Sequence, residues 1–267
     1  MRCTEKMNLS EAEPDQLLAL EFRKLFMRRE VCALAASRHG RMLACAIAAL
    51  LLSPGARAQF SATISADSDY RFRGVVLNGS RPTVRLTGNF DTESGWYAGA
   101  SASRAQIAQG DRYAQLVGYG GYAIRAFEGR SWDLGATYSH FFGDTAYDYG
   151  ELYTGLVSER WSLRLNYSPD YYGRNVQTAY LDASGHVPLD NFLRLAAHVG
   201  LMVPLTSRGG AGPRANRTRA DFRAGAGWTM GNADLQIAWT TTTRGGPFPA
   251  QAAGRRSGWL FSASSSF

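Results

Sequence analysis

The sequence predicts an all-β protein: a transmembrane antiparallel up-and-down β-barrel of about 12 strands, preceded by an export leader. Three observations support this prediction. Polar and apolar residues alternate in successive segments after residue 58, short and long connections alternate between these segments, and aromatic residues gather near the segment ends. Transmembrane barrels have strands with one apolar and one polar face, short turns at one end, long loops at the other, and two aromatic girdles.

Residues 1–58 differ from the rest of the chain and predict a secretory signal peptide. A basic region that includes Arg38 and Arg41 precedes the apolar run 42–52, and an A-x-A site ends at Ala58. We expect cleavage after Ala58, so that residues 59–267 form the barrel domain. The eleven-residue apolar run is too short for a transmembrane helix. Residues 1–26 fit no signal peptide, and a true start at Met27 is the alternative to a long natural leader.

Charge and cysteine usage narrow the function classes. All three cysteines lie in residues 1–58, so the predicted domain has no disulfide framework. Nine of the 29 basic and six of the 22 acidic residues also lie there, which leaves 20 Arg against 16 acidic residues. Much of the chain's high isoelectric point therefore comes from the leader, and we expect no nucleic-acid partner.

The first predicted strand, 61–74, alternates over all 14 positions. Ile64, Tyr70 and Phe72 fall on one side, and four charged residues fall on the other. Segment 161–168 alternates equally well, whereas 112–126, 131–141 and 148–158 are rich in Gly and Tyr and alternate less clearly. The remaining strands are predicted in order at 82–91, 95–104, 112–126, 131–141, 148–158, 161–168, 176–187, 191–203, 217–229, 232–243 and 257–267.

The connections and aromatic residues give this strand set an orientation. Short turns are expected at 91–94, 127–130, 159–160, 188–190 and 230–231, with long polar loops between the other pairs of strands. One predicted girdle, near the turns, contains Phe90, Trp96, Trp132, Trp161, Phe192, Trp228 and Phe267. The other, near the loops, contains Tyr70, Phe72, Tyr138, Phe141, Tyr149, Tyr167, Trp239, Trp259 and Phe261. A soluble β-sandwich also has alternating strands, but it does not explain the alternating connections.

Several motifs resemble the TorF family of proteobacterial outer-membrane porins, first catalogued with unknown function. They are SDYRFRG at 68–74, ESGWYA at 93–98, LRLNYSPDYYG at 163–173 and the AAHVG that ends at Gly200. The resemblance covers roughly residues 61–243 and implies an outer-membrane barrel of porin type. It supplies no substrate and no functional residues.

If the apolar faces contact lipid, the opposite faces line the lumen. The predicted lining residues are Asp67, Asp69, Arg71, Arg73, Arg85, Arg164, Arg219, Asp221 and Arg223. Six arginines against three aspartates predict passive diffusion of small polar solutes with a weak preference for anions. The alternative is a non-conducting barrel with a structural or surface-interaction role, in which Arg and Asp pair across the lumen and close it.

Enzyme chemistry is not expected, and we expect no cofactor and no metal site. An outer-membrane lipase would place a Ser and a His near the rim; His140 lies near a predicted loop, but no G-x-S-x-G elbow is present. The three histidines of the predicted domain lie on separate strands without ligand spacing. Expected partners are outer-membrane lipids, the barrel-assembly machinery through the strand that ends at Phe267, and lipopolysaccharide, whose phosphates would suit the loop residues Arg208, Arg214, Arg217 and Arg219.

Overall fold

The computed structural model describes residues 58–267 except residues 80, 106–112, 128, 207–215 and 249–255. The predicted signal peptide and its alternative start therefore lie outside the described residues. Residues 57–267 form one compact unit. No helix among the described residues is long and apolar enough to cross a membrane.

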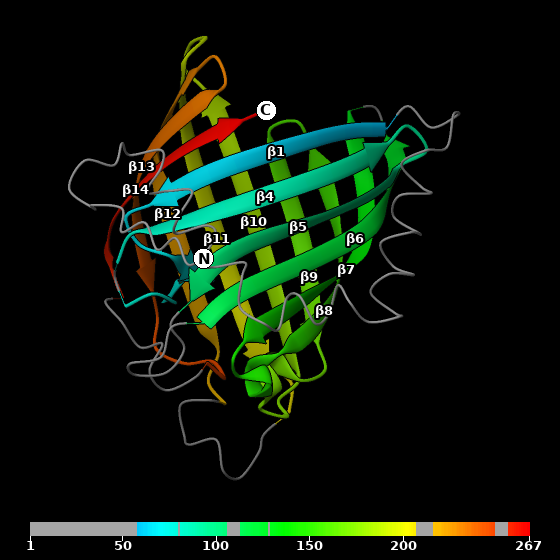
Figure 1. The fold of residues 1–267 in the computed structure, drawn as a ribbon, viewed down its shortest axis with the longest axis vertical. Helices are drawn as coiled ribbons and strands as arrows, with labels where there is room; N and C mark the ends of the chain where they lie inside the picture. The colour runs from blue at the N-terminus through cyan, green and yellow to red at the C-terminus, as the bar shows by residue number, and fades with distance from the viewer. Residues whose placement is uncertain (1–57, 80, 106–112, 128, 207–215, 249–255) are drawn as a thin grey trace, which may run out of the picture. The chain divides into compact units, whose positions relative to one another are not determined.

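The described residues form a closed antiparallel barrel of 12 strands, as predicted (Figure 1). Every strand pairs with its neighbour in sequence, and the barrel closes where β1 pairs with β14, for example Asp67 with Ser262. The barrel strands are β1 (Ala58–Asp67), β4 (Thr83–Thr92), β5 (Trp96–Ala105), β6 (Tyr113–Phe127), β7 (Arg130–Phe142), β8 (Tyr149–Ser158), β9 (Trp161–Ser168), β10 (Thr178–Pro188), β11 (Leu193–Pro204), β12 (Arg219–Met230), β13 (Ala233–Thr242) and β14 (Gly258–Ser266).

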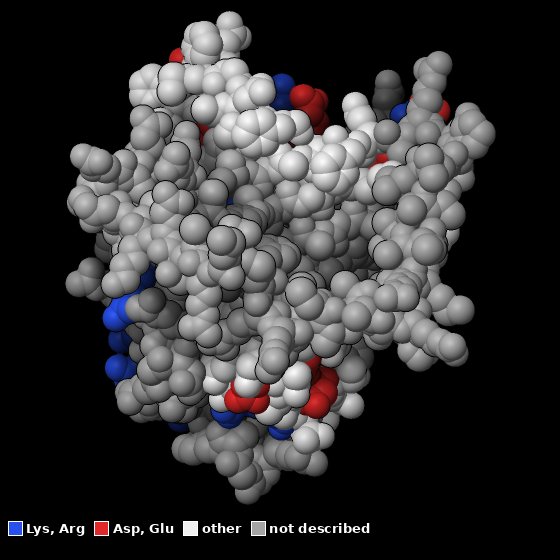
Figure 2. All heavy atoms as spheres, viewed as in Figure 1, with Lys and Arg blue, Asp and Glu red and all other residues white. Residues whose placement is uncertain are grey.

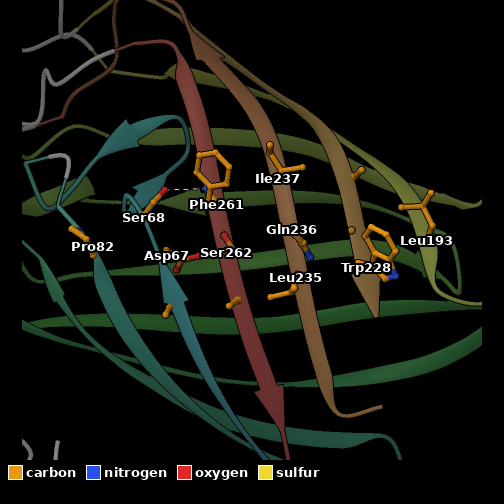
Figure 3. A pocket seen from close by; sticks show the side chains of 14 residues that line it. Asp67, Ser68, Pro82, Leu193, Trp228, Leu235, Gln236, Ile237, Phe261 and Ser262 are labelled. Atoms are coloured by element: carbon orange, nitrogen blue, oxygen red, sulfur yellow. Dashed lines mark hydrogen bonds between the residues drawn. The ribbon is translucent and has the colours of Figure 1, made fainter. Parts of the chain in front are cut away.

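Side-chain alternation places apolar residues on the outer face of the wall. Trp228, Leu235, Ile237 and Phe261 lie side by side over β12, β13 and β14, where they border a shallow recess of about 500 Å³ (Figure 3). Their neighbours along the same strands, such as Gln236 and Ser262, belong to the opposite face because successive strand residues point to opposite sides. On the side of the molecule in view, described acidic and basic side chains lie close together at the lower end (Figure 2).

The first predicted strand is the one strand that the sequence placed wrongly. β1 ends at Asp67, and the chain then forms a separate two-stranded hairpin of β2 (Arg71–Phe72) and β3 (Val75–Val76) before β4 begins. Arg73 and Gly74 at the tip have φ values of +49° and +73°. Positive φ at both central residues is the signature of a type I′ turn, which reverses the chain and cannot continue a strand.

The prediction of two aromatic girdles needs a related correction. Trp96, Trp132, Trp228, Trp239 and Trp259 are exposed on the outer face, where the prediction placed them. Four aromatic residues predicted near the loops, by contrast, belong to a cluster of buried or partly buried residues; they are Tyr70, Phe72, Phe141 and Tyr149. Tyr70 and Phe72 are not in the outer girdle because β1 ends before them. Phe141 and Tyr149 are not in it because their side chains alternate onto the inner face.

Candidate functional site

The inner face of the barrel is polar, and its side chains bridge strands that are not neighbours. Arg164 on β9 contacts Asp133 on β7 with an Nη2 to Oδ2 distance of 2.6 Å. The Arg194 guanidinium on β11 reaches both carboxylate oxygens of Asp234 on β13, at 2.6 and 2.8 Å. Contacts that pass over an intervening strand are possible only on the concave side of the wall, so these residues face the lumen.

The β2–β3 hairpin lies inside this lumen. Its tip packs against the inner face of β12 and β13, because a Cβ atom built on Gly74 would come within 2.7 Å of Asp221 Cβ and 2.8 Å of Thr242 Cβ. On the other side, Arg73 reaches Glu151 on β8, which lies five strands away from β1 around the barrel. The connection from β1 to β4 therefore folds inward and crosses the lumen.

A buried ion pair fixes the hairpin to the far wall. Arg73 Nη1 donates to Glu151 Oε1 at 2.7 Å and Nη2 donates to Oε2 at 2.8 Å, and the two side chains are only 7% and 5% exposed. The guanidinium also lies 4.2 Å from the ring centroid of Tyr180. Burial is the largest single effect and opposes the charged form of Arg73, but the charge and hydrogen bonds of Glu151, together with Tyr171 and Tyr149, raise the pKa of Arg73 well above its ordinary value.

Aromatic and aliphatic side chains pack around this hairpin inside the barrel. We call residues 70–77 the plug. Its buried members Tyr70, Val75 and Leu77 pack in one cluster with side chains from the strands and loops: Ala105, Phe141, Tyr149, Tyr171, Tyr172, Tyr180, Met202 and Phe248. Leu77, Phe141 and Tyr171 have no exposed surface, so the plug is packed as densely as a domain core at these positions.

The loop between β9 and β10 supports the plug. Its short 3-10 helix η2 (Tyr171–Gly173) packs on η1 (Thr145–Tyr147), and a Cβ on Gly173 would collide with the Ala146 carbonyl oxygen. Tyr172 stacks on Tyr149 with ring centroids 4.6 Å apart. Burial raises the pKa of Tyr172 well above its ordinary value, which keeps the phenol neutral.

Beside the hairpin lies a cavity of about 260 Å³, which we call the central chamber. Hairpin residues and inner-face residues of the wall line it together. The lining residues are Arg71, Phe72, Arg73, Gly74, Arg164, Asn166, Tyr180, Asp182, His198, Asp221, Arg223, Thr240 and Leu260.

A second cavity of about 340 Å³ extends towards the short turns, and we call it the turn-end chamber. Its lining includes Ser184, His186, Arg194 and Gln236. Arg223 borders both cavities. Within the described part of the chain, Arg223 has neither a hydrogen bond nor an ion pair, so its guanidinium is free at the boundary between the chambers.

His198 organises the remaining polar groups at this boundary. Its Nδ1 lies 2.8 Å from Ser184 Oγ, and its Nε2 lies 3.1 Å from Asp221 Oδ1 and 3.2 Å from the Tyr180 hydroxyl. The residue types match a serine-hydrolase triad, but the ring nitrogens are exchanged: in such triads Nε2 faces the serine and Nδ1 the aspartate. The geometry fits a network that orients His198 and Asp221 better than it fits a hydrolytic centre.

Comparison with known proteins places the chain in a family. The model of the family described as "Bacterial protein of unknown function (Gcw_chp)" matches residues 53–244. The chain belongs to this Gcw_chp family. The match supports the resemblance seen in the motifs, while the name TorF itself stays a prediction. No curated protein sequence matches the chain significantly.

Solved structures similar to this Gcw_chp protein include porins. A NanC porin superposes with a TM-score of 0.52 at 12% identity, covering 78% of this chain and 99% of that chain. A KdgM porin superposes with a TM-score of 0.48 at 11% identity, and the match again covers 78% of this chain and 99% of that chain. LpxR from Salmonella typhimurium superposes with a TM-score of 0.46 at 9% identity, and the match covers 78% of this chain and 99% of that chain. At this identity the NanC likeness shows the fold alone, a barrel of porin type.

The predicted lining residues divide into two groups. Arg85, Arg164, Arg219, Asp221 and Arg223 lie with Asp67 on the inner face of the wall strands. Asp69, Arg71 and Arg73 lie in the inward-folded connection and not on a wall strand, which corrects the prediction that they belong to the first strand. Whether these residues line a conducting pore stays a prediction.

Most of the predicted arginines in this Gcw_chp barrel are paired. Four form ion pairs with carboxylates: Arg71 with Asp69, Arg73 with Glu151, Arg85 with Asp67, and Arg164 with Asp133. Arg71 uses only its Nε for Asp69, at 2.9 Å, and its buried Nη1 has no hydrogen-bond partner. Of these pairs, Arg73 with Glu151 crosses the lumen, whereas the other three are local or join nearby strands, and Arg223 is left without a partner among the described residues.

Sequence reasoning missed several lumen residues. Arg194 and Asp234 lay on the polar faces of cleanly alternating strands, so the same signal that found Arg164 could have found them. Glu151 and Asp133 lie on β8 and β7, whose Gly- and Tyr-rich sequences hide the alternation. No local pattern indicates that Glu151 pairs with Arg73, because 78 residues separate them.

The other predicted sites are placed as follows. His140 contacts Asp148 with a 2.6 Å Nδ1 to Oδ2 distance, and among the described residues no serine hydroxyl is hydrogen-bonded to it. Arg208 and Arg214 lie outside the described residues. Arg219 was also predicted to contact lipopolysaccharide, but it turns inward, where it donates to Thr242 Oγ1 and to the Gly245 carbonyl. In the described part of the chain, no group of three or more His, Asp or Glu could hold a metal ion.

Proposed function

We propose that the protein is an outer-membrane channel of porin type that passes small polar solutes by passive diffusion and prefers anions. The observation that carries the proposal is the free guanidinium of Arg223 between two lumen cavities. An unpaired cation in a narrow, low-dielectric passage raises the local concentration of anions and lowers their barrier to passage. Arg71, Arg73 and Arg164 add positive charge around the same chamber.

The plug requires that such a channel has a closed state. The packed cluster around Leu77 lies in the lumen, and on this proposal it blocks passage until the hairpin leaves it. Polar contacts that join the hairpin to distant parts of the barrel include the Arg73 to Glu151 pair, the Arg73 guanidinium over the Tyr180 ring and the Tyr70 hydroxyl that donates to Gln115 Oε1 at 3.1 Å. Loss of these few contacts would let the hairpin move as one unit. We propose that release of this hairpin opens the channel.

We place the channel in the outer membrane, in contact with lipids and lipopolysaccharide, and assign no enzymatic activity to it. The barrel architecture, the apolar outer face and the porin-like fold support this location. We further propose that the strand ending at Phe267 is recognised by the barrel-assembly machinery, since its exposed aromatic side chain lies at the end of β14, beside β1.

Conductance across planar bilayers tests the proposal. Protein purified from outer membranes should insert and give discrete channel events, with a reversal potential in a salt gradient that indicates anion preference. Arg223→Gln should reduce this preference, whereas Arg125→Gln, at an exposed position near the turn end of β6, should leave it unchanged. Absence of channel events across repeated insertions of both the wild type and a variant with a weakened plug, such as Glu151→Gln, would contradict the proposal, and so would cation selectivity.

The second candidate is a non-conducting barrel with a structural or surface-interaction role. The packed plug and the four ion pairs of the predicted arginines favour it. It predicts that even variants with a weakened plug stay silent in bilayers. Channel events that appear when the plug is weakened would exclude this candidate.

A further inference from the structure

We propose that the central chamber binds a small polyhydroxylated anion, such as a sugar or a sugar acid with a single carboxylate or phosphate group. This inference deepens the proposed function, because it names the solute class that the chamber selects. It rests on three features of the lining: unused cationic donors, acceptors suited to hydroxyl groups, and one apolar surface.

The anionic group has donors ready for it. Arg223 has no partner in the described part of the chain, and it borders the chamber. Arg71 also lines the chamber and binds Asp69 only through Nε; its Nη1 is buried and has no partner, so Arg71 adds positive charge to the chamber but not an exposed donor. Guanidinium groups such as that of Arg223 pair strongly with carboxylates and phosphates in two-pronged geometry.

The rest of the lining excludes a ligand that is only an anion. Asp182 on β10 uses one carboxylate oxygen for Asn166, at 3.2 Å, and its other oxygen has no hydrogen-bond partner in the described part of the chain. A free carboxylate oxygen repels a second anionic group and accepts from hydroxyl groups. The Thr240 hydroxyl and Asn166 add further hydrogen-bonding groups. One end of the ligand is therefore negative, and the rest carries hydroxyl groups.

The apolar surface and the volume of the central chamber limit the size of the ligand that it can hold. Phe72 of the hairpin and Leu260 of β14 line the chamber, and a sugar ring presents a C–H face that packs on such side chains. The volume of about 260 Å³ lies below the range of about 300–1,000 Å³ that holds drug-sized ligands. One monosaccharide unit or a chain of similar size matches it, and an oligomer does not.

Isothermal titration calorimetry on the full protein, purified from outer membranes in detergent, tests this inference without requiring conduction. The probes are gluconate and glucose 6-phosphate as hydroxylated anions, glucose as the neutral control, and acetate and inorganic phosphate as anions without the polyol. We expect gluconate, glucose 6-phosphate or both to bind about tenfold or more tightly than glucose, acetate and phosphate. The comparison of gluconate with glucose 6-phosphate decides between a carboxylate and a phosphate group.

Two variants locate the binding. Arg223→Gln should weaken binding of the hydroxylated anion about tenfold or more. Asp182→Asn should weaken its binding relative to that of acetate, whose weak binding should increase because the repelling carboxylate is gone. Arg125→Gln, outside the chamber, is the matched charge control and should bind like the wild type. Equal affinity for glucose and the hydroxylated anions, equal affinity for acetate, or full binding in Arg223→Gln would overturn the assignment. Channel events without binding overturn this inference alone, whereas binding without channel events overturns the porin proposal alone.

Discussion

Neutralising Glu151 should release the plug. In Glu151→Gln the Arg73 guanidinium stays in an environment where it is only 7% exposed and loses its carboxylate partner. Removing one partner of a buried ion pair costs about 3–5 kcal/mol, because the remaining charge is buried without compensation. At about 1.4 kcal/mol per factor of ten, the population with an undocked hairpin should rise about 100-fold or more.

Cysteine labelling measures this population directly. No cysteine follows Cys45 in the sequence, so Val76→Cys introduces the one thiol of residues 46–267, at a position that is 4% exposed. A membrane-impermeant maleimide should label it slowly in the wild-type background and about 100-fold faster with Glu151→Gln. Channel open probability should rise in parallel if the plug controls conduction.

Two controls separate the buried pair from general loss of charge. The double variant Arg73→Gln with Glu151→Gln leaves no unpaired charge, so it should label more slowly than Glu151→Gln alone. Asp67→Asn breaks the pair with Arg85, whose side chain is 36% exposed, and should change labelling by less than about fivefold. The reasoning is refuted if Glu151→Gln labels no faster than wild type, or if Asp67→Asn has the larger effect.

Three further predictions follow from the same packing. Gly74→Ala should also release the hairpin and speed labelling of Val76→Cys at least tenfold. The φ of +73° disfavours Ala, and the Ala Cβ would lie 2.7 Å from Asp221 Cβ. A labelling rate equal to that of Val76→Cys alone would contradict this prediction. Because burial raises the Tyr172 pKa above its ordinary value of 10.0, docking should be fully stable below that value and should weaken as pH rises through the higher pKa of the folded protein. Ultraviolet titration should show late phenolate ionisation from the buried tyrosines, and Tyr172→Phe should reduce its amplitude by one phenol without removing it. Wild-type protein should not hydrolyse a detergent-dispersed ester; activity that is lost in His140→Ala would instead revive the lipase interpretation.

The barrel wall was predictable from the sequence because the alternating pattern that identifies its strands is local. Apart from the first strand, each wall strand begins and ends within two residues of its predicted position, and 161–168 is identical. Alternation, turn residues and connection length are all properties of short segments, so they can be read without knowing which strands meet. The same rule failed at 61–74 because alternation does not distinguish a continuous strand from a strand followed by a tight hairpin.

The contents of the lumen were only partly predictable. The sequence gives the polar face of each strand, and with it Arg164, Arg223 and Asp221. It does not indicate which of these side chains meet across the barrel, because the partners Glu151 and Asp133 are far away in sequence. The free guanidinium of Arg223 is likewise visible only once the partners of the other arginines are known.

The two most specific motifs of the chain meet in the plug. SDYRFRG supplies Tyr70, the Arg73 to Glu151 contact and the positive-φ turn, and YSPDYYG supplies Tyr171 and Tyr172, which pack against it. A wall strand needs only polar and apolar residues in alternation, and many sequences satisfy that requirement. A packed plug needs particular residues: a glycine where a Cβ would collide, an arginine that reaches a buried carboxylate, and rings of matching shape. Hence the part of the sequence that is most distinctive lies inside the lumen, in the plug that we propose to be the gate, and not in the wall that forms the barrel.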